Sequence, residues 1–180
     1  MEEEALFIKR LIHPSTQEAA FRELVSRYKK PLYHHLRTLL LHHDDTDDVL
    51  QNTFIKIFRN IQNFKGESKL YSWMFRIATN EALTFLKQKA AKKQLSLDDL
   101  SEQLVHWIQE DALYTGDEIQ LLLQKALITL PEKQQLVFKM KYFQQLDYQT
   151  ISEILQTSVG ALKASYHHAV KKIALFLKDH

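Results

Sequence analysis

Histidine and aspartate side chains cluster at two neighbouring places in the first third of the chain, where such residue types can bind a metal. They are His34, His35, His42, His43, Asp44 and Asp45. Adjacent histidines on a helix point about 100° apart, and no HExxH-type pattern brings two of them onto one face. The chain has no cysteine, which excludes disulfides, thiolate catalysis and cysteine-bound zinc. We therefore expect no enzyme activity, no metal site, no cofactor and no small-molecule substrate.

A second group of residues has the chemistry needed to bind single-stranded DNA. At helical spacing, five side chains between residues 68 and 89 share one narrow arc: Lys69, Trp73, Arg76, Asn80 and Lys87. Cations suit phosphates, whereas an aromatic ring and an amide suit unstacked bases. In the alternative interpretation, Trp73 belongs to the core and the cations are merely solvated.

A third group lies on the helix expected after residue 46. An apolar stripe faces inward there, formed by Leu50, Thr53, Phe54, Ile57 and Ile61. The opposite face carries Asp48, Gln51, Asn52, Ile55 and Arg59, so that Ile55 is an apolar side chain among polar ones. A protein partner would explain this position, although single exposed apolar residues are common.

The C-terminal segment has the pattern of a helix-turn-helix motif. A short helix with Ile151, Ile154 and Leu155 inward precedes a polar turn and a longer helix. Periodicity places Val159, Leu162, Tyr166, Ala169, Val170 and Ile173 on the inner face of that helix. The outer arc then carries Gly160, Lys163, Ala164, His167, His168 and Lys171, which would face the major groove of DNA. A helical hairpin with a solvated basic face is the alternative, and Gln156 stands where the turn usually has glycine.

Helices are the only elements that the composition favours. Three glycines and three prolines leave few sites for the tight turns of a β fold. A capping box at Ser15–Glu18 predicts the start of an amphipathic helix, kinked at Pro31. Thr46 is expected to cap the next helix, and further helices are expected at about 68–89, at 119–130 and after Pro131, with caps at Asp147 and Ser158.

Charge divides the chain into two basic blocks. The net charge is only +2, but residues 95–123 contain no lysine or arginine and several acidic side chains. We therefore expect an all-α protein of two small helical domains, 1–93 and 118–180, joined by an acidic linker, 94–117. The N-terminus lacks the features of a signal peptide and no apolar run is long enough to span a membrane, so we expect a cytoplasmic protein.

Several of these segments resemble the sigma-70-type sigma factors of RNA polymerase, in their extracytoplasmic-function (ECF) subfamily. Residues 130–138, Tyr142-Phe143, residues 151–155 and residues 157–163 resemble region 4, which binds the promoter −35 element. Residues 47–55 resemble region 2.2, which binds core RNA polymerase, and residues 64–80 resemble regions 2.3 and 2.4, which melt the −10 element and capture a flipped base. The chain departs from the common pattern at Ser165, His168 and Val170, where many members have arginine.

The resemblance implies a role for each surface. It assigns core-polymerase binding to Asp48, Gln51, Asn52 and Ile55, and −10 DNA binding to Lys69, Trp73, Arg76, Asn80 and Lys87. It assigns −35 DNA binding to Ser158, Gly160, Lys163, Ala164, His167 and Lys171. It further implies an anti-sigma partner and a linker that enters the polymerase channels. A stand-alone helix-turn-helix regulator is the alternative, but it would leave the surfaces before residue 94 without a role.

Overall fold

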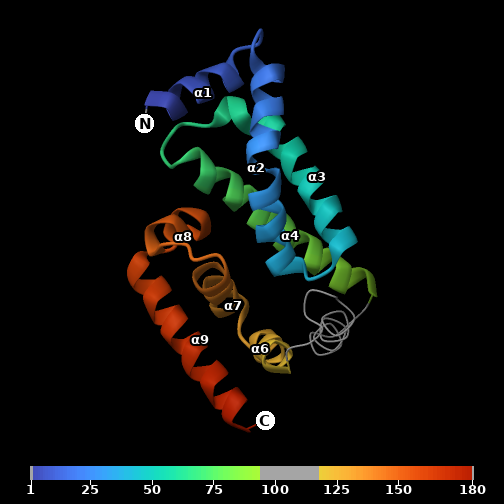
Figure 1. Ribbon diagram of the computed structural model, residues 1–180, viewed down its shortest axis with the longest axis vertical. Coiled ribbons are helices and arrows are strands. Elements are labelled where there is room, and N and C mark those ends of the chain that lie inside the picture. Colours follow the sequence, from blue (N-terminus) through green and yellow to red (C-terminus); the bar gives the residue numbers. More distant parts are fainter. Residues whose placement is uncertain (1, 94–117, 180) are drawn as a thin grey trace.

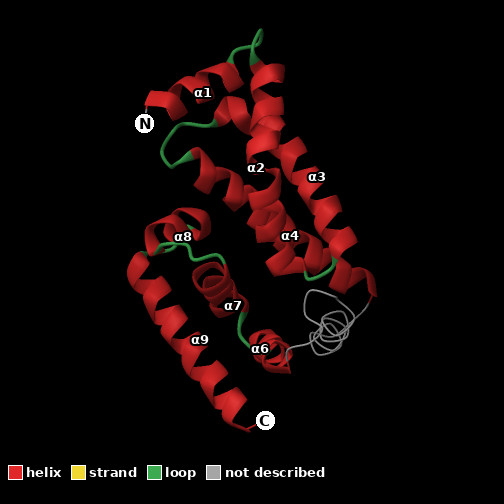
Figure 2. Cartoon of the chain, in the orientation of Figure 1, coloured by secondary structure: helices red, strands yellow, loops and turns green. Residues whose placement is uncertain are grey.

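The computed structural model describes residues 2–93 and 118–179. Every regular element in these two ranges is helical, as Figure 2 shows. The all-α fold class predicted from the sequence is therefore confirmed. None of the described helices is both long and apolar enough to cross a membrane. The linker expected at 94–117 lies outside the described residues.

The N-terminal domain is a bundle built around one long helix. Its elements are α1 (Glu2–Ile12), α2 (Gln17–Leu40), α3 (His43–Asn60), the 3-10 turn η1 (Ile61–Asn63) and α4 (Leu70–Lys93). Helices α3 and α4 pack against α2 and against each other (Figure 1). The apolar faces of α2, α3 and α4 form a fully buried core. It includes Leu32 and Leu36 of α2, Ile57 of α3 and Met74 of α4. Pro31 lies inside α2, which continues beyond it to Leu40.

Two helix starts differ from the sequence-based prediction. The capping residue of α2 is Thr16, not Ser15, and its hydroxyl donates to the Arg10 carbonyl at 2.8 Å instead of capping its own helix. Helix α3 begins at His43, so Thr46 is not its cap. The Thr46 hydroxyl donates to the His42 carbonyl four residues earlier, at 2.6 Å. A threonine inside a helix commonly forms this hydrogen bond with the preceding turn.

Helix α1 is an addition to the predicted elements. It buries Phe7 and Leu11 against the bundle core. The Glu4 carboxylate accepts a hydrogen bond of 2.7 Å from the backbone N–H of Leu70, the first residue of α4. Helix α1 therefore caps α4 from a distance in sequence, because the first N–H groups of a helix need outside acceptors.

The C-terminal domain consists of α6 (Glu118–Ile128), α7 (Glu132–Phe138), the π-helical turn η2 (Lys139–Phe143), α8 (Tyr148–Leu155) and α9 (Val159–Asp179). The expected caps are confirmed: Asp147 accepts from the Thr150 N–H at 2.8 Å, and the Ser158 hydroxyl lies 3.4 Å from the Ala161 N–H. Gln156 adopts the left-handed conformation, with φ of 51°. The helix-turn-helix therefore forms with glutamine at the position where glycine is usual.

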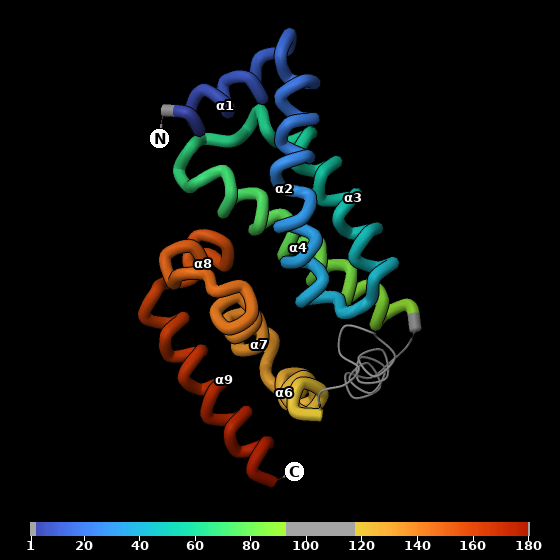
Figure 3. The backbone as a smooth tube through the Cα atoms, viewed as in Figure 1, coloured from blue at the N-terminus to red at the C-terminus, as the bar shows by residue number. Residues whose placement is uncertain are grey.

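The two domains share one hydrophobic core. Leu136, Val137 and Met140, together with Ile151 and Ile154 of α8, join the buried cluster of the N-terminal bundle. The backbone tube in Figure 3 shows α8 beside the first half of α4, and the contacts between these two helices confirm it. A smaller cluster, with Leu127, Phe138, Ala169 and Ile173 at its centre, holds α6, α7 and α9 together.

Candidate functional site

The predicted −10 residues lie along the face of α4 and just before its start. Lys69, Asn80 and Lys87 are exposed, whereas Trp73 and Arg76 are half-buried. The Trp73 ring packs on Phe64, with 5.2 Å between ring centroids. Trp73 is therefore both part of the domain's packing and a member of the exposed arc.

Trp73 lines two pockets. One, of about 360 Å³, is lined by Lys65, Trp73 and Arg76 from the N-terminal domain and by Glu153 and Gln156 from the C-terminal domain. The other, of about 470 Å³, is lined by Trp73 and Asn80 together with Asn60, Asn63 and Lys56. Three amides beside an indole match the chemistry of a base-binding pocket, since amides bond base edges and rings stack on base faces.

The sequence alone did not indicate Asn60, Asn63 and Lys56 as members of this surface. They lie at the end of α3 and in η1, and they reach the pocket because α3 packs beside α4. Lys56 also forms an ion pair with Glu81 of α4, which joins the two helices at this point. No periodicity within one segment could reveal a surface formed by two.

The predicted polymerase-facing residues share one exposed face of α3. Asp48, Gln51 and Asn52 are exposed, and 41% of Ile55 is accessible to solvent. Phe58 lies one turn further along, with 42% of its surface accessible. It is a candidate that the sequence analysis missed, although its spacing of three from Ile55 would have indicated it. The Phe21 ring supports Phe58 edge-on, with centroids 4.9 Å apart.

The outer arc of α9 lies on the protein surface as predicted. The six residues assigned to −35 binding are all exposed: Ser158, Gly160, Lys163, Ala164, His167 and Lys171. The Lys163 ammonium lies 5.8 Å from the centroid of the Tyr148 ring on α8. One inner-face prediction is wrong, because 41% of Val170 is accessible. Ala169, predicted on the same face, is buried, because it is closer in angle to Leu162 and Ile173 on the helix.

The histidines considered as metal ligands have separate environments. His35 is buried next to Thr79, with 2.8 Å between Nε2 and the hydroxyl oxygen. His43 lies at the surface, where its Nδ1 is 2.6 Å from the Tyr33 hydroxyl and its Nε2 is 3.5 Å from Asp47. Within residues 2–93 and 118–179, no three histidines or carboxylates gather into a metal-binding group.

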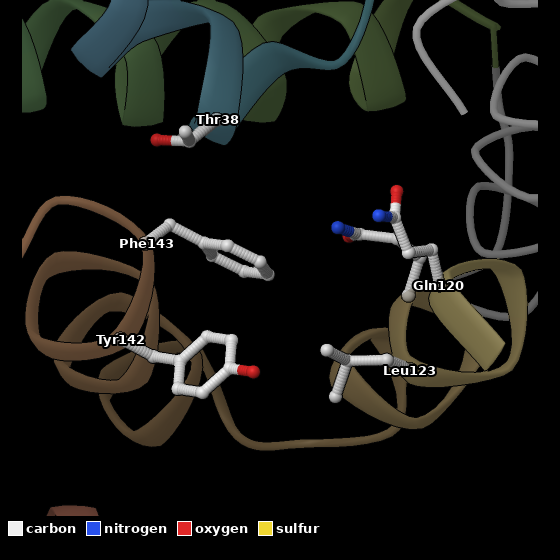
Figure 4. A pocket seen from close by; sticks show the side chains of 6 residues that line it. Thr38, Gln120, Leu123, Tyr142 and Phe143 are labelled. Carbon is white, nitrogen blue, oxygen red and sulfur yellow. The ribbon is translucent and has the colours of Figure 1, made fainter. Parts of the chain in front are cut away.

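The domain boundary contains a polar bridge and a small pocket. Gln144 of the C-terminal domain hydrogen-bonds with both His35 and Thr38 of α2. Next to it, a pocket of about 340 Å³ is lined by Thr38, Leu123, Tyr142 and Phe143, among others. Figure 4 shows the two aromatic rings and Leu123 on one side of this pocket and Thr38 of α2 on the other.

Comparison with known proteins identifies both domains. Residues 24–92 match the family described as Sigma-70 region 2, and residues 120–173 match Sigma-70, region 4. The chain is 29% identical over 163 residues to the ECF RNA polymerase sigma-E factor of Haemophilus influenzae, covering 86% of this chain and 85% of that protein. It is 28% identical over 169 residues to the ECF RNA polymerase sigma factor SigW of Bacillus subtilis, covering 89% and 90%.

Two solved structures have the same fold. One is CnrH in complex with the cytosolic domain of CnrY, with a TM-score of 0.68 at 19% identity over 98% of this chain and 97% of that chain. The other is the sigma factor RpoE from Bartonella quintana in complex with the anti-sigma factor NepR, with a TM-score of 0.63 at 19% identity over 88% and 96%. Both domains match in the order predicted from the sequence, and the full-length relatives are similar across most of the chain. The chain therefore belongs to the sigma-70 family of RNA polymerase sigma factors, in its extracytoplasmic-function subfamily.

Proposed function

We propose that the chain is a regulatory, non-enzymatic sigma factor that directs core RNA polymerase to specific promoters and promotes initiation of transcription. The observation that carries this proposal is the presence of three distinct candidate binding faces on one chain that matches sigma region 2 and region 4 in order. A polymerase-facing patch, a strand-binding arc and a helix-turn-helix are together what promoter recognition and opening require.

The exposed face of α3 is assigned to core polymerase. Ile55 and Phe58 supply apolar area, and Asp48, Gln51 and Asn52 supply a polar rim around it. This composition is that of a protein interface, where a few apolar anchors lose water and polar neighbours surround them.

The arc on α4 is assigned to the −10 element as a single strand. Lys69, Arg76 and Lys87 are cations that suit the phosphates of a strand, and Trp73 and Asn80 line the amide-rich pocket that suits an unstacked base. Binding energy that is available only to the unpaired strand lowers the cost of opening the duplex.

The outer arc of α9 is assigned to the −35 duplex. Near the start of the helix, Lys163 and His167 have side chains long enough to reach base edges, and Ala164 offers a methyl group that suits contact with a thymine methyl. Lys171 lies two turns beyond Lys163 and is assigned to phosphate.

Transcription with purified components tests the function and its alternative together. Core RNA polymerase plus the full chain should produce promoter-dependent transcripts that core polymerase alone does not produce. A stand-alone helix-turn-helix regulator would bind duplex DNA but would not give core polymerase this ability. Absence of such transcripts with promoters selected from a random library would contradict the proposal.

One further partner and a compartment are proposed from the family. The Bartonella quintana neighbour was solved with an anti-sigma factor, and we extend that class of partner to this chain, whose groove at Tyr142 and Phe143 offers apolar surface at the domain boundary. A protein whose partners are core polymerase and promoter DNA is assigned to the compartment that contains them, the cytoplasm.

A further inference from the structure

The segment of residues 61–69, between α3 and α4, lines the surface assigned to the −10 strand. Its residue Asn63 lines both of the pockets that Trp73 lines. Four more of its residues line the pocket of about 360 Å³: Phe64, Lys65, Glu67 and Ser68. The shape of both pockets therefore depends on how the 61–69 segment is held.

Helix α1 contacts the 61–69 segment at both of its ends. At the start, the Gln62 side-chain amide donates to the Ile12 carbonyl at 2.9 Å. At the end, the Leu70 backbone N–H donates to the Glu4 carboxylate at 2.7 Å. Eight residues of helix span about 12 Å, so these two hydrogen bonds lie well apart along α1. Figure 3 shows α1 running alongside the segment that it contacts.

Helix α1 is itself fixed to the rest of the N-terminal domain. Phe7 and Leu11 are buried in the shared core, and the Arg27 guanidinium of α2 lies 4.9 Å from the centroid of the Phe7 ring. Arg10 forms an ion pair of 2.9 Å with Glu23 of α2. Because α1 is anchored in this way, it can hold the 61–69 segment in one position instead of moving with it.

Glu4 acts at the point where α4 begins. Burial raises the pKa of the Tyr28 hydroxyl on α2, and the negative charge of Glu4 adds a smaller effect in the same direction. The Glu4 carboxylate is therefore within electrostatic range of α2 while it accepts from Leu70. Leu70 directly follows Lys69, whose carbonyl accepts from the Trp73 N–H at 3.1 Å. The first turn of α4, with two of the residues assigned to the strand, thus starts beside the residue that Glu4 holds.

We propose that α1 holds the 61–69 segment in its strand-binding conformation, and that Glu4 and Gln62 are positioning residues for recognition of the −10 strand. Both act through the segment and not by contact with DNA. A segment that is ordered before binding loses less conformational entropy on binding, and it keeps Asn63 and Trp73 at fixed positions around a base. This inference rests on the assignment of the α4 arc to the −10 strand, and it gives α1 a part in that recognition.

Binding of the holoenzyme to fluorescent single-stranded oligonucleotides tests the inference. One oligonucleotide carries the −10 sequence of a promoter that the holoenzyme transcribes, and the others each have one base of it changed. Glu4→Ala removes the acceptor, and Gln62→Met removes the donor at nearly the same side-chain length. We expect each variant to bind the preferred strand roughly fivefold more weakly, because each lacks one hydrogen bond that orders the segment. Each should also discriminate less against the changed bases.

Two control variants separate positioning from a loss of folded protein. Glu4→Gln keeps an oxygen that can accept from the Leu70 N–H, so it should bind within about twofold of wild type. Glu3→Ala, at the exposed neighbouring position, should behave as wild type. A smaller folded fraction would weaken binding to every oligonucleotide and to core polymerase by one factor. A loosened segment should instead change the ratio between oligonucleotides and leave the affinity for core polymerase unchanged.

Hydrogen exchange in the full chain measures the hold on the segment directly. Backbone N–H groups of residues 61–70 should exchange faster in Glu4→Ala and Gln62→Met than in wild type, because local opening becomes easier. Those of α3 should exchange at the same rate in all variants. Unchanged exchange across residues 61–70 would overturn the proposal.

The binding results separate this inference from the proposed function. If the wild-type holoenzyme does not distinguish the −10 strand from its changed versions, the assignment of the α4 arc is wrong and the inference falls with it. If wild type distinguishes them and Glu4→Ala and Gln62→Met do so equally well, the function stands and the role of α1 is wrong. Failure of Glu4→Gln to restore binding would show that Glu4 does not act as the acceptor for Leu70.

Discussion

His35 of the N-terminal domain and Gln144 of the C-terminal domain are joined by a hydrogen bond of 2.9 Å between Nδ1 and Oε1. Gln144 also donates to the Thr38 hydroxyl at 3.0 Å. Burial lowers the pKa of His35 to about 4, against a smaller opposing effect of its hydrogen bond with Gln144. The bridge between the domains is therefore built on a neutral imidazole, and protonation of this buried ring should destabilise the folded chain.

The first prediction is a loss of stability in mild acid. An unfolded histidine has a pKa of about 6.5, so between that pH and about pH 4 the unfolded chain binds a proton that the folded chain excludes. The free energy of unfolding should fall across this window by roughly 1 kcal/mol per pH unit and level off below it. Urea unfolding at about pH 7 and about pH 5 measures the change.

Replacement of His35 isolates its share of this change. The His35→Gln variant should lose stability but lack that part of the pH dependence, whereas His34→Gln, at the exposed neighbouring position, should behave as wild type. If His35→Gln and wild type lose equal stability between the two pH values, His35 is not the responsible group.

The second prediction concerns the cap that α1 provides. Glu4→Ala removes the acceptor for the Leu70 N–H and should lower the free energy of unfolding by about 1 kcal/mol, as loss of a helix cap does. The adjacent Glu3→Ala is the control, because Glu3 is exposed and no cap depends on it. Equal unfolding midpoints for the two variants would show that the contact contributes nothing to stability.

The third prediction tests the polymerase-facing patch. Ile55→Glu should leave the fold intact, because the side chain is on the surface, and should weaken binding to core polymerase more than tenfold, since it places an unpaired charge in a buried contact. Leu6→Glu is a matched control at another exposed apolar position. Binding of labelled chain to core polymerase measures both, and unchanged affinity of Ile55→Glu would refute the assignment.

The fourth prediction separates DNA opening from polymerase binding. Arg76→Ala or Asn80→Ala should slow formation of the open complex on duplex promoters. A template with a pre-melted bubble across the −10 element should restore much of the activity, because the cost of unpairing is already met. Gln88→Ala, at an exposed site on the same helix, should have no effect on either template. Equal losses on duplex and bubble would argue against a role in opening.

The fifth prediction distinguishes base contacts from phosphate contacts on α9. Lys163→Ala or His167→Ala should reduce the free energy of binding to the preferred −35 sequence by roughly 1 to 3 kcal/mol. Either change should also relax selectivity at one or two −35 positions. Lys171→Ala should weaken binding to all −35 sequences about equally and lower the salt dependence. The affinity of each holoenzyme for promoters with different −35 sequences, measured at two salt concentrations, distinguishes base contacts from phosphate contacts. The reverse pattern would mean that α9 is placed wrongly in the groove.

Helical periodicity predicted the faces of single helices well. The inner stripe of α3 and the outer arc of α9 follow from spacing alone, because apolar side chains must face the core. The wrong position, Val170, lies next to Ala169 at the edge of the buried stripe, where a rotation of one residue decides burial. Signals for α1 were also present, in Phe7 and Leu11 four residues apart and in Lys9 and Arg10 at the end of the helix.

The arrangement of the two domains could not be predicted in this way. Gln144 sits in a polar turn with no periodic pattern, and nothing near it in the sequence indicates that it reaches His35 across 109 positions. Glu153 likewise looks like an ordinary surface carboxylate until α8 is placed beside α4, where it lines the same pocket as Arg76. Contacts between polar groups far apart in the chain depend on the tertiary fold. Local sequence patterns therefore do not predict them.

The core that the two domains share has a consequence for how the chain unfolds. Leu136, Val137, Ile151 and Ile154 belong to the same buried cluster as the helices of the N-terminal bundle. Loss of either domain therefore exposes apolar surface of the other to water. We expect the two domains to unfold together in one cooperative transition.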